Sequence, residues 1–463
     1  MSRETTSSTA KPRPRAVLVG VQLPGVSEEE LTSSLDELAR LGKTLGLDVV
    51  ARITQRRDRL APAAVVGEGK LKELAALTGG SGVVPTGPPD QGREEEEEEA
   101  APAEAEPRAD RATVVVVDHE LTPSQARNLE RATGAEVLDR SAVILAIFQR
   151  HARTREARLQ VEIARLSYVA PRLRETGGRD RQGGGIGGRG AGESQLELDR
   201  RKLRDRIAEL RQELAAIERE SGTRRRRRSE VPTAALVGYT NAGKSSWMRA
   251  LTGSGVRVED KLFATLDTTV RALQPETTPR VLISDTVGFI KKLPHDLVAS
   301  FRSTLEEARE AGLLVHVADA ADPAFPAQIE VTREVLASLG AGDAPRLLVL
   351  NKADRLDAAA REALARDWPD ALLLSSRDPA DVAKLRERIV AFFERDMEEA
   401  ELLIPFTQQR LVSEAHATTH VLSETHSEAG TRLRVRAAPE ALTRLRSLLG
   451  KTRGSGDARK RGR

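Results

Sequence analysis

The residues from Gly238 to Ser245 have the types and spacing that bind the phosphates of a nucleotide. They read Gly-Tyr-Thr-Asn-Ala-Gly-Lys-Ser and fit the pattern G-x-x-x-x-G-K-S. Backbone amides of such a turn point at phosphate oxygens, and the helix that follows adds its positive amino end. Lys244 is expected to reach the β- and γ-phosphates, and the Ser245 hydroxyl to ligate Mg²⁺. An apolar run, 234–237, precedes the loop, as expected of the strand before it.

The segment Asn351–Asp354 follows another apolar run, 347–350, and predicts which base is bound. A carboxylate at Asp354 can accept hydrogen bonds from N1–H and the exocyclic amine of guanine. Adenine does not offer this donor pair, so it would leave the acceptor unpaired. Asn351 is expected to bond the far edge of the base, and the Lys352 side chain to lie along its face. The ligands predicted are therefore GTP and GDP.

A third motif, Asp285–Gly288, lies between these two and follows the apolar run 281–284. In this Asp-x-x-Gly element Asp285 would hold Mg²⁺ through water, and the Gly288 amide would sense the γ-phosphate. Each motif alone could be an ordinary turn, but the three in this order favour a GTP site.

Phe289 stands where many GTPases carry the glutamine that orients the attacking water. A phenylalanine side chain can neither donate to nor accept from that water. Two interpretations stay open. Either a partner supplies the missing group, or Phe289 packs in a core while backbone groups hold the water.

Composition limits the other chemistries that the chain can perform. Its 463 residues are enough for about three domains. The absence of cysteine excludes disulfides, thiolate metal sites and cysteine nucleophiles, and it suits a reducing cytosol. The first 15 residues are polar and basic, unlike a secretory signal, and no run approaches the roughly 20 apolar residues of a membrane span. Lys and Arg together number 73, and Asp and Glu 70. The net charge of the whole chain therefore indicates no class of partner, and only local charged segments can do so.

An N-terminal α/β domain is expected over 16–140, because strand-like and helix-like segments alternate there. Ser27 can cap a helix that carries leucines on one face. Strands are expected at 16–21, 49–53, 63–66 and 113–117. The stretch 79–110 contains six consecutive glutamates and predicts a disordered surface insertion, with a functional acidic arm as the alternative.

A helical hairpin is expected over 141–222, because two segments carry narrow apolar seams of coiled-coil type. The seams consist of Leu159, Ile163, Leu166, Ala170 and Leu173, and of Leu203, Ile207, Leu210, Leu214 and Ile217. The simplest arrangement of the two helices is antiparallel. Their connection, 177–192, holds nine glycines in 16 residues and several arginines. Bare backbone and arginines suit close contact with phosphates, so RNA contact is favoured over a plain connector.

A doubly wound GTPase domain is expected over 229–395, with strands near residues 234, 281, 313, 347 and 371. A small α/β domain over 400–450 reads strand, helix, strand, strand, helix, and a basic tail, 451–463, follows it. Arg224–Arg228 are expected to be a solvated linker, with phosphate contact as the alternative. The predicted fold class is α/β, with a P-loop GTPase domain, an N-terminal α/β domain bearing the hairpin, and a small C-terminal α/β domain.

With these motifs in place, the chain resembles the HflX family of translational GTPases. The resemblance covers most of the chain outside the acidic insertion and the two termini. The segments that carry it are 54–58, 67–70, 121–125, 137–140, 152–156, 182–197, 199–201, 263–267 and 285–289.

The resemblance implies a cytoplasmic GTPase that binds the large ribosomal subunit and acts in ribosome splitting, rescue or recycling under stress. It implies contact with ribosomal RNA through the 177–192 region. Together with Phe289, it predicts slow intrinsic hydrolysis that the ribosome stimulates. A monomer is expected, and association with a membrane surface is left open. A nucleotide-regulated RNA-remodelling factor and a protein adaptor remain as alternatives.

The resemblance also places the first switch at Phe263–Asp267 and a guanine contact at Ser375–Arg377. It implies that Thr265 ligates Mg²⁺ and faces the γ-phosphate. Thr268 stands where proline is usual in the family, and Ser375-Ser-Arg377 where Ser-Ala is common. The residues expected to act in catalysis are Lys244, Thr265 and Gly288, and those expected to ligate the metal are Ser245 and Thr265. The residues expected to bind the nucleotide are Gly238, Tyr239, Thr240, Asn241, Ala242, Gly243, Lys244, Ser245, Phe263, Ala264, Thr265, Leu266, Asp267, Asp285, Thr286, Val287, Gly288, Asn351, Lys352, Ala353, Asp354, Ser375, Ser376 and Arg377.

Overall fold

The computed structural model describes residues 13–84, 110–173, 195–228, 231–255, 262–263, 269–292 and 307–451. Contacts divide the chain into two compact units, Met1–Ala152 with Arg158–Arg211, and Arg153–Ala157 with Gln212–Arg463. Most of the expected acidic insertion, the whole 177–192 connection, Ala264–Asp267 of the first switch and residues 452–463 of the basic tail lie outside the described residues. The domain boundaries given above stay a prediction.

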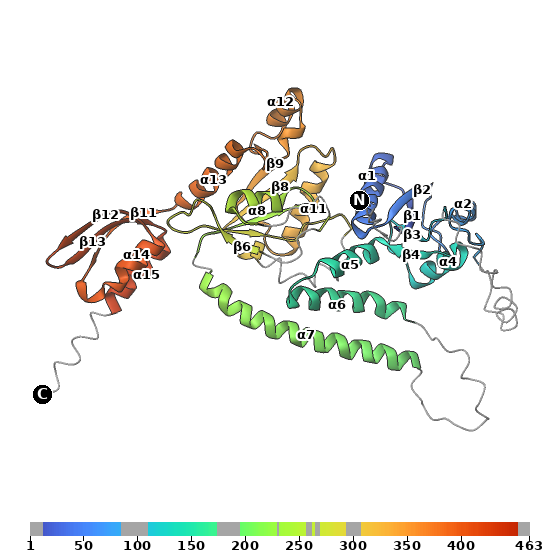
Figure 1. Cartoon of the computed structure of the whole chain (residues 1–463), viewed down its shortest axis with the longest axis horizontal. Helices are drawn as coiled ribbons and strands as arrows, with labels where there is room; N and C mark the ends of the chain where they lie inside the picture. Colours follow the sequence, from blue (N-terminus) through green and yellow to red (C-terminus); the bar gives the residue numbers. More distant parts are fainter. Residues whose placement is uncertain are drawn as a thin grey trace, which may run out of the picture. The chain divides into compact units, whose positions relative to one another are not determined.

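The N-terminal region is built on a four-stranded parallel sheet in the order β2-β1-β3-β4 (Figure 1). Helices α2 and α4 pack together on one face, and α1 and α5 on the other. The elements are β1 (Arg15–Gln22), α1 (Glu28–Leu45), β2 (Asp48–Arg56), α2 (Glu68–Thr78), β3 (Val114–Val117), α4 (Pro123–Thr133), β4 (Glu136–Asp139) and α5 (Arg140–His151). The expected open parallel sheet is confirmed.

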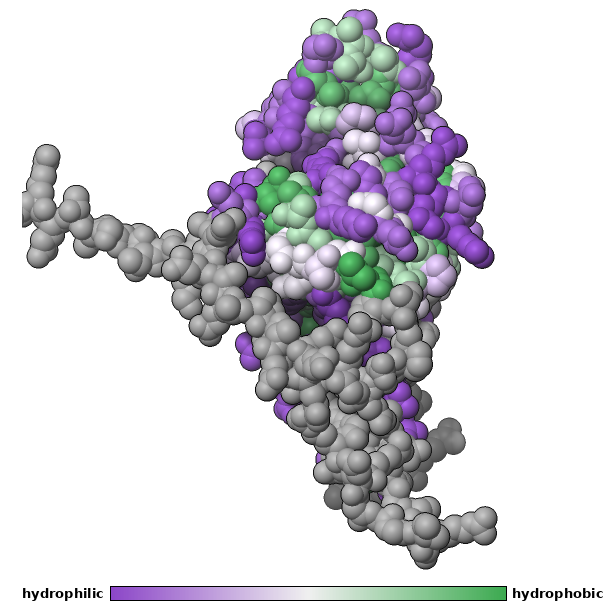
Figure 2. Space-filling model, turned by 90° about the vertical axis from the view of Figure 1, so that its right-hand side faces the viewer, coloured by the Kyte–Doolittle hydropathy of each residue, from purple (hydrophilic) through white to green (hydrophobic). Residues whose placement is uncertain are grey.

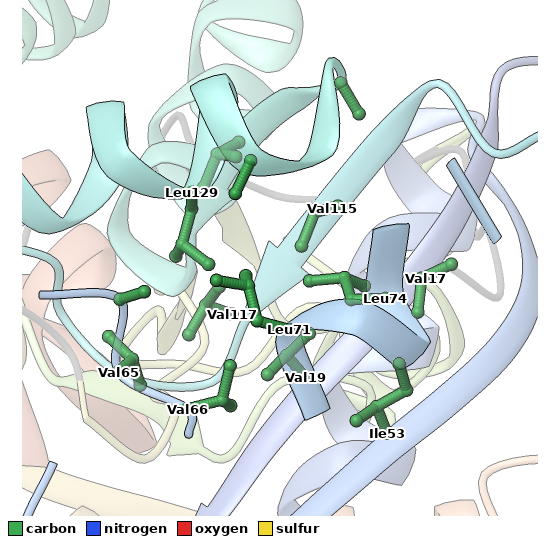
Figure 3. Close-up of a cluster of buried hydrophobic side chains, with 14 of the residues drawn as sticks. Val17, Val19, Ile53, Val65, Val66, Leu71, Leu74, Val115, Val117 and Leu129 are labelled. Carbon is green, nitrogen blue, oxygen red and sulfur yellow. The ribbon is translucent and has the colours of Figure 1, made fainter. Parts of the chain in front are cut away.

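Alternation along the strands builds the core on the α2 and α4 face of this sheet. Every second residue of β1 and β3 points to this side, as the period of two requires, and these residues are valines. The labelled members of the cluster in Figure 3 are Val17, Val19, Ile53, Val65, Val66, Leu71, Leu74, Val115, Val117 and Leu129. They come from three strands, two helices and one turn.

The prediction of a strand at 63–66 is wrong, because these residues form a turn. Val65 has a φ of 66°, a backbone conformation that a strand cannot contain. The amide of Ala61 donates to the Val65 carbonyl and the amide of Val65 to the Ala61 carbonyl, both at 2.9 Å. The backbone therefore pairs with itself, while Val65 and Val66 still fill the core.

A buried charge cluster joins α1, the end of β3 and the start of α5. Arg140 is 2% exposed and donates to Asp118 at 2.8 Å and to Glu37. Ser34 donates to the same Asp118 carboxylate at 2.7 Å. Because a buried charge is costly unless it is paired, this cluster fixes the two helices against the strand end.

Helices α6 (Arg155–Val169) and α7 (Gln195–Arg228) form the helical region, and the short η1 (Ala170–Arg172) ends the first. Arg155 forms an ion pair with Glu213 at 2.9 Å. The pKa of Glu162 is lowered by its hydrogen bond from Arg165 and also by Arg206. As residue numbers increase along α6, the residues they face on α7 have decreasing numbers, so the two helices run antiparallel (Figure 1). Helix α7 continues through Arg224–Arg228, where a solvated linker was expected.

The short helix η1 is attached to the N-terminal region by Arg172. Arg172 donates to the Leu121 carbonyl at 2.9 Å and to the buried Asp139 carboxylate at 3.1 Å. Its guanidinium also lies 3.5 Å from the centre of the Tyr168 ring. These contacts anchor η1 to the end of β4 and to the segment after β3.

The nucleotide domain has a six-stranded sheet in the order β10-β9-β8-β5-β7-β6. Helices α8 and α13 pack on one face, and α11 and α12 on the other. The elements are β5 (Thr233–Gly238), α8 (Lys244–Thr252), β6 (Thr269–Ala272), β7 (Leu282–Asp285), β8 (Leu313–Asp319), α11 (Phe325–Ser338), β9 (Arg346–Asn351), η2 (Ala353–Arg355), α12 (Ala358–Asp367), β10 (Leu372–Leu373) and α13 (Pro379–Glu394). The expected strands are present. β6 was not expected, and it pairs antiparallel with β7, so the sheet is mixed.

The C-terminal region is an antiparallel sheet in the order β11-β13-β12, covered on one face by two helices. Its elements are β11 (Glu398–Ile404), η3 (Phe406–Gln408), α14 (Arg410–Thr418), β12 (His420–Ser427), β13 (Gly430–Ala437) and α15 (Pro439–Lys451). The predicted order of strand, helix, strand, strand and helix is confirmed. Gly430 has a φ of 137° at the turn between β12 and β13.

Apolar side chains on the described surface are scattered. In the coloured part of the face in Figure 2, purple predominates and green lies in small patches. The large apolar side chains that are exposed among the described residues are Val50, Leu77, Val83, Leu403, Phe406 and Leu422. Single exposed apolar residues are normal and carry no argument for an interface. No helix within the described ranges has the length and apolar character to cross a bilayer.

Candidate nucleotide-binding site

The phosphate loop runs from the end of β5 to the start of α8 and is pressed against two neighbouring strands. Gly238 and Gly243 have φ values of 144° and 101°, which favour glycine. A Cβ on Gly238 would lie 2.1 Å from the Val317 carbonyl oxygen, and one on Gly243 would lie 2.1 Å from the Asn351 Nδ2. The strand order therefore requires glycine at both ends of the loop.

Lys244 lies inside the loop, as the motif predicts. Its buried ammonium donates to the carbonyls of Gly238 at 3.0 Å and Tyr239 at 2.8 Å. Burial lowers the pKa of Lys244 to about 8, and the nearby Asp285 carboxylate opposes this shift. The ammonium is therefore a positive charge held in a poorly solvated place, where it interacts strongly with an anion.

Ser245 and Asp285 lie together at the start of α8. The Ser245 hydroxyl donates to the Asp285 carboxylate at 2.8 Å. A hydroxyl and a carboxylate are the hard oxygen ligands that Mg²⁺ prefers, so this pair fits a magnesium ion beside bound phosphates. Thr265, the second expected metal ligand, lies outside the described residues, and so do Ala264, Leu266 and Asp267. Phe263, at the start of the first switch, is buried.

Asp354 is an ionised acceptor at the base loop. The Ser375 hydroxyl donates to Asp354 Oδ1 at 2.7 Å, and this bond is the main cause of the lowered pKa of Asp354. Arg377 lies 3.7 Å from the other carboxylate oxygen. The Asp354 side chain is 35% exposed, so it can still meet a ligand, whereas Ser375 is buried.

Asn351 joins the base loop to the phosphate loop. Its Nδ2 donates to the Ala242 carbonyl at 2.8 Å, and its Oδ1 accepts from the Ser376 amide at 3.2 Å. Both ends of this buried amide are bonded to protein backbone, and its expected contact with the base stays a prediction. Lys352 donates to the Asn241 carbonyl at 2.9 Å, which adds a second tie between the same loops.

The second switch, Asp285–Phe289, lies along the phosphate loop. The Thr286 hydroxyl donates to the Leu236 carbonyl at 2.7 Å. Phe289 is 2% exposed, which supports the interpretation that its side chain packs in a core. The structure therefore brings together segments 238–245, 285–289, 351–354 and 375–377.

Comparison with known proteins agrees with this geometry. Residues 233–352 match the family model described as 50S ribosome-binding GTPase. Residues 32–84 and 93–149 match the GTP-binding GTPase N-terminal model, and residues 151–228 match the GTP-binding GTPase Middle Region model. GTPase HflX of Gluconacetobacter diazotrophicus is 59% identical over 448 residues, which cover 95% of this chain and 99% of that protein. The chain belongs to the HflX family of GTPases.

Other HflX relatives agree along most of the chain. GTPase HflX of Escherichia coli is 38% identical over 423 residues, which cover 90% of this chain and 92% of that protein. Among solved structures, a GTP-binding protein of Sulfolobus solfataricus in complex with GDP is similar, with a TM-score of 0.41 and 22% identity over 81% of this chain and 97% of that chain. The identities with the two HflX proteins confirm, at the level of the family, the resemblance found in the motifs.

One residue of this HflX-family site was missed in the sequence. Asp319 ends β8, and its carboxylate accepts from Lys352 at 2.6 Å. Its position in the sequence could have indicated a site residue, because an acid at the carboxyl end of a parallel strand lies where such sheets bind their ligands. The motifs do not predict Asp319, because it belongs to none of the three.

Proposed function

We propose that this protein binds GTP and hydrolyses it to GDP and phosphate. The observation that carries the proposal is the ionised Asp354 carboxylate, held by Ser375 on a loop that Asn351 ties to the phosphate loop. A base bound there meets an acceptor that guanine can satisfy and adenine cannot. Phosphates bound to the adjoining loop meet the charge of Lys244.

The expected roles of the residues follow from their places. Lys244 stabilises the charge that develops on the phosphates, and the Gly288 amide faces the γ-phosphate. Ser245 and Thr265 would hold Mg²⁺, which supplies further positive charge when bound. The Phe289 side chain is buried and apolar, so it offers no group to orient water. Intrinsic hydrolysis is therefore expected to be slow.

Replacement of Asp354 tests the base assignment. In Asp354→Asn, affinity for GDP should fall roughly 10- to 150-fold, the range for hydrogen bonds to a charged group, and affinity for xanthosine diphosphate (XDP) should rise. Binding of labelled GDP and XDP would measure this. Asp357→Asn is the matched control, because Asp357 caps α12 and asparagine caps helices equally well. If Asp354→Asn still prefers guanine, the assignment is wrong.

We also propose that the partner is the large ribosomal subunit and that the protein acts in splitting, rescuing or recycling ribosomes in the cytoplasm. The match to the 50S ribosome-binding GTPase model supports the partner. The glycines and arginines of 177–192 support contact with RNA phosphates. The subunit is expected to stimulate hydrolysis, and the protein is expected to act as a monomer.

Removal of the arginines in the 177–192 connection tests the RNA contact. Replacing Arg179, Arg181 and Arg189 by glutamine should raise the subunit concentration needed for half-maximal stimulation, while hydrolysis without subunits stays unchanged. The salt dependence of binding should weaken by about two to three in the slope of log K against log salt, as expected for three lost phosphate contacts. The control variant replaces Arg224, Arg225 and Arg226 by glutamine, which removes the same positive charge from another part of the chain. If both triple variants behave alike, the RNA contact does not lie in the 177–192 connection.

A further inference from the structure

Lys352, in the base loop, has a backbone conformation that a lysine rarely adopts. Its φ is 64°, in the left-handed region, which costs an L-residue roughly 1–2 kcal/mol. A residue keeps such a conformation only where the surrounding structure holds it there. The contacts of the Lys352 side chain are one source of that support.

Two oxygen atoms hold the Lys352 ammonium. Its Nζ donates to the Asn241 carbonyl of the phosphate loop at 2.9 Å and to Asp319 Oδ2 at 2.6 Å. The side chains of Lys352 and Asp319 are only 14% and 16% exposed. Because solvent and salt screen a partly buried ion pair less than a pair on the open surface, this pair can fix the position of the ammonium.

The Asp319 carboxylate is itself fixed at the end of β8. Its Oδ1 accepts from the Ala321 amide at 3.1 Å, while its Oδ2 accepts from Lys352. The Ala320 amide donates to the Asn351 carbonyl at 2.9 Å, so the turn after β8 is bonded to the last residue of β9. The carboxylate is therefore presented from a rigid support. The ammonium, at the end of a long side chain, takes the position that the carboxylate sets.

The ion pair also distinguishes the two lysines of the site. Lys244 donates to carbonyls of its own loop and lies where phosphates are expected. The charge of Lys352 is matched by Asp319 on the side of the base loop. What Lys352 offers to a nucleotide is then the apolar stem of its side chain, and a stem that is held at its end presents a constant surface to the face of a base.

We propose that Asp319 is a positioning residue for base binding. It holds the Lys352 ammonium against the Asn241 carbonyl and thereby keeps the stem of Lys352 where the face of guanine is expected. Asp319 does not itself touch the nucleotide. Its effect is on the face of the base, whereas Asp354 acts on the edge, so the effect is the same for guanine and xanthine. The inference deepens the proposed GTP binding and rests on it for the identity of the ligand.

Asp319→Asn tests the inference, because asparagine keeps the size of the side chain and removes its charge. Affinity for GDP should fall about three- to tenfold, as expected when a hydrogen bond loses its charged acceptor. In the Asp354→Asn background, affinity for XDP should fall by the same factor. The matched control is Asp322→Asn, which removes a charge from the same turn and can still accept from the Ala324 amide. Its affinity for GDP should stay within about twofold of the wild type.

A double variant separates this role from a merely structural one. Lys352→Met keeps an unbranched stem and removes the ammonium, so Asp319 has nothing left to position. In the Lys352→Met protein, Asp319→Asn should therefore change GDP affinity by less than about twofold. Titration with fluorescent GDP and XDP would measure these affinities. An unchanged GDP affinity in Asp319→Asn, the full loss again in the double variant, or unequal factors for GDP and XDP would overturn the proposal.

Failure of the proposed function would give a different result. A wild type that does not hydrolyse GTP, but binds GDP and loses affinity in Asp319→Asn as described, would refute the GTPase activity and leave this inference intact. A wild type that hydrolyses GTP, with normal GDP binding in Asp319→Asn, would refute this inference alone.

Discussion

At the scale of single residues, we propose that Ser375 and Asp354 together select the base. The Ser375 hydroxyl fixes one carboxylate oxygen and helps to keep Asp354 ionised. The motif predicted Asp354 from its spacing. It did not predict the hydrogen bond, because the serine lies 21 residues further along the chain and only the fold brings it close.

Ser375→Ala should weaken GDP binding about three- to tenfold, because Asp354 loses the bond that orients it. Titration with a fluorescent GDP would measure the change. Ser376→Ala is the control, since Ser376 contributes its backbone amide to Asn351 and keeps that amide in the variant. Equal losses in both variants would mean that the bond to Asp354 is unimportant.

We expect His316 to make the GTPase domain sensitive to acid. It lies buried on β8, and burial together with the nearby Arg333, Arg346 and Lys244 charges lowers its pKa to about 3. The unfolded chain binds this proton near pH 6.5, so the folded state loses stability as pH falls below that value. Between pH 7 and pH 5 the loss should be about 2 kcal/mol.

Unfolding by urea at pH 7 and pH 5, followed by tryptophan fluorescence, would measure this loss. Both tryptophans, Trp247 and Trp368, lie in the expected GTPase domain, so they report on it alone within the full chain. His316→Leu should remove most of the pH dependence, and His420→Gln, at an exposed position, should not. A His316→Leu variant with the full acid sensitivity of the wild type would show that other groups cause it.

At the scale of elements, most of the architecture follows from local rules. Helix α1 begins where Ser27 accepts from the Glu30 amide at 3.0 Å, and it ends at Gly46 with a φ of 89°. Two elements escaped these rules. The apolar residues at 63–66 fill the core from a turn, and β6 is a short, partly exposed strand without a clear alternating pattern.

The buried cluster around Arg140 is expected to hold α1, the end of β3 and α5 together. Arg140→Met should destabilise the N-terminal domain by about 3–5 kcal/mol, because Asp118 and Glu37 would stay buried without their partner. Faster hydrogen exchange in α1 and β3 of the full chain would show it. Arg52→Met is the control, since the ion pair of Arg52 with Asp36 at 2.6 Å is exposed and worth about 0–1 kcal/mol. Similar exchange in the two variants would contradict the role of the cluster.

At the scale of the whole molecule, sequence and structure each supply a different part of the account. The three nucleotide motifs lie far apart in the chain, and the sheet order brings them to one edge. That convergence was predictable, because parallel strands present their carboxyl ends together. The ties between loops, from Asn351 and Lys352, were not predictable, because each depends on the final placement of backbone groups.

We further propose that GTP controls binding of this protein to the large ribosomal subunit, so that the nucleotide site and the subunit-binding site are coupled. Co-sedimentation of the full chain with purified large subunits tests it most directly, with a non-hydrolysable GTP analogue, with GDP and without nucleotide. Binding should be at least about tenfold tighter with the GTP analogue, which corresponds to about 1.4 kcal/mol of coupling between the two sites. Equal pelleting in all three conditions would contradict the account.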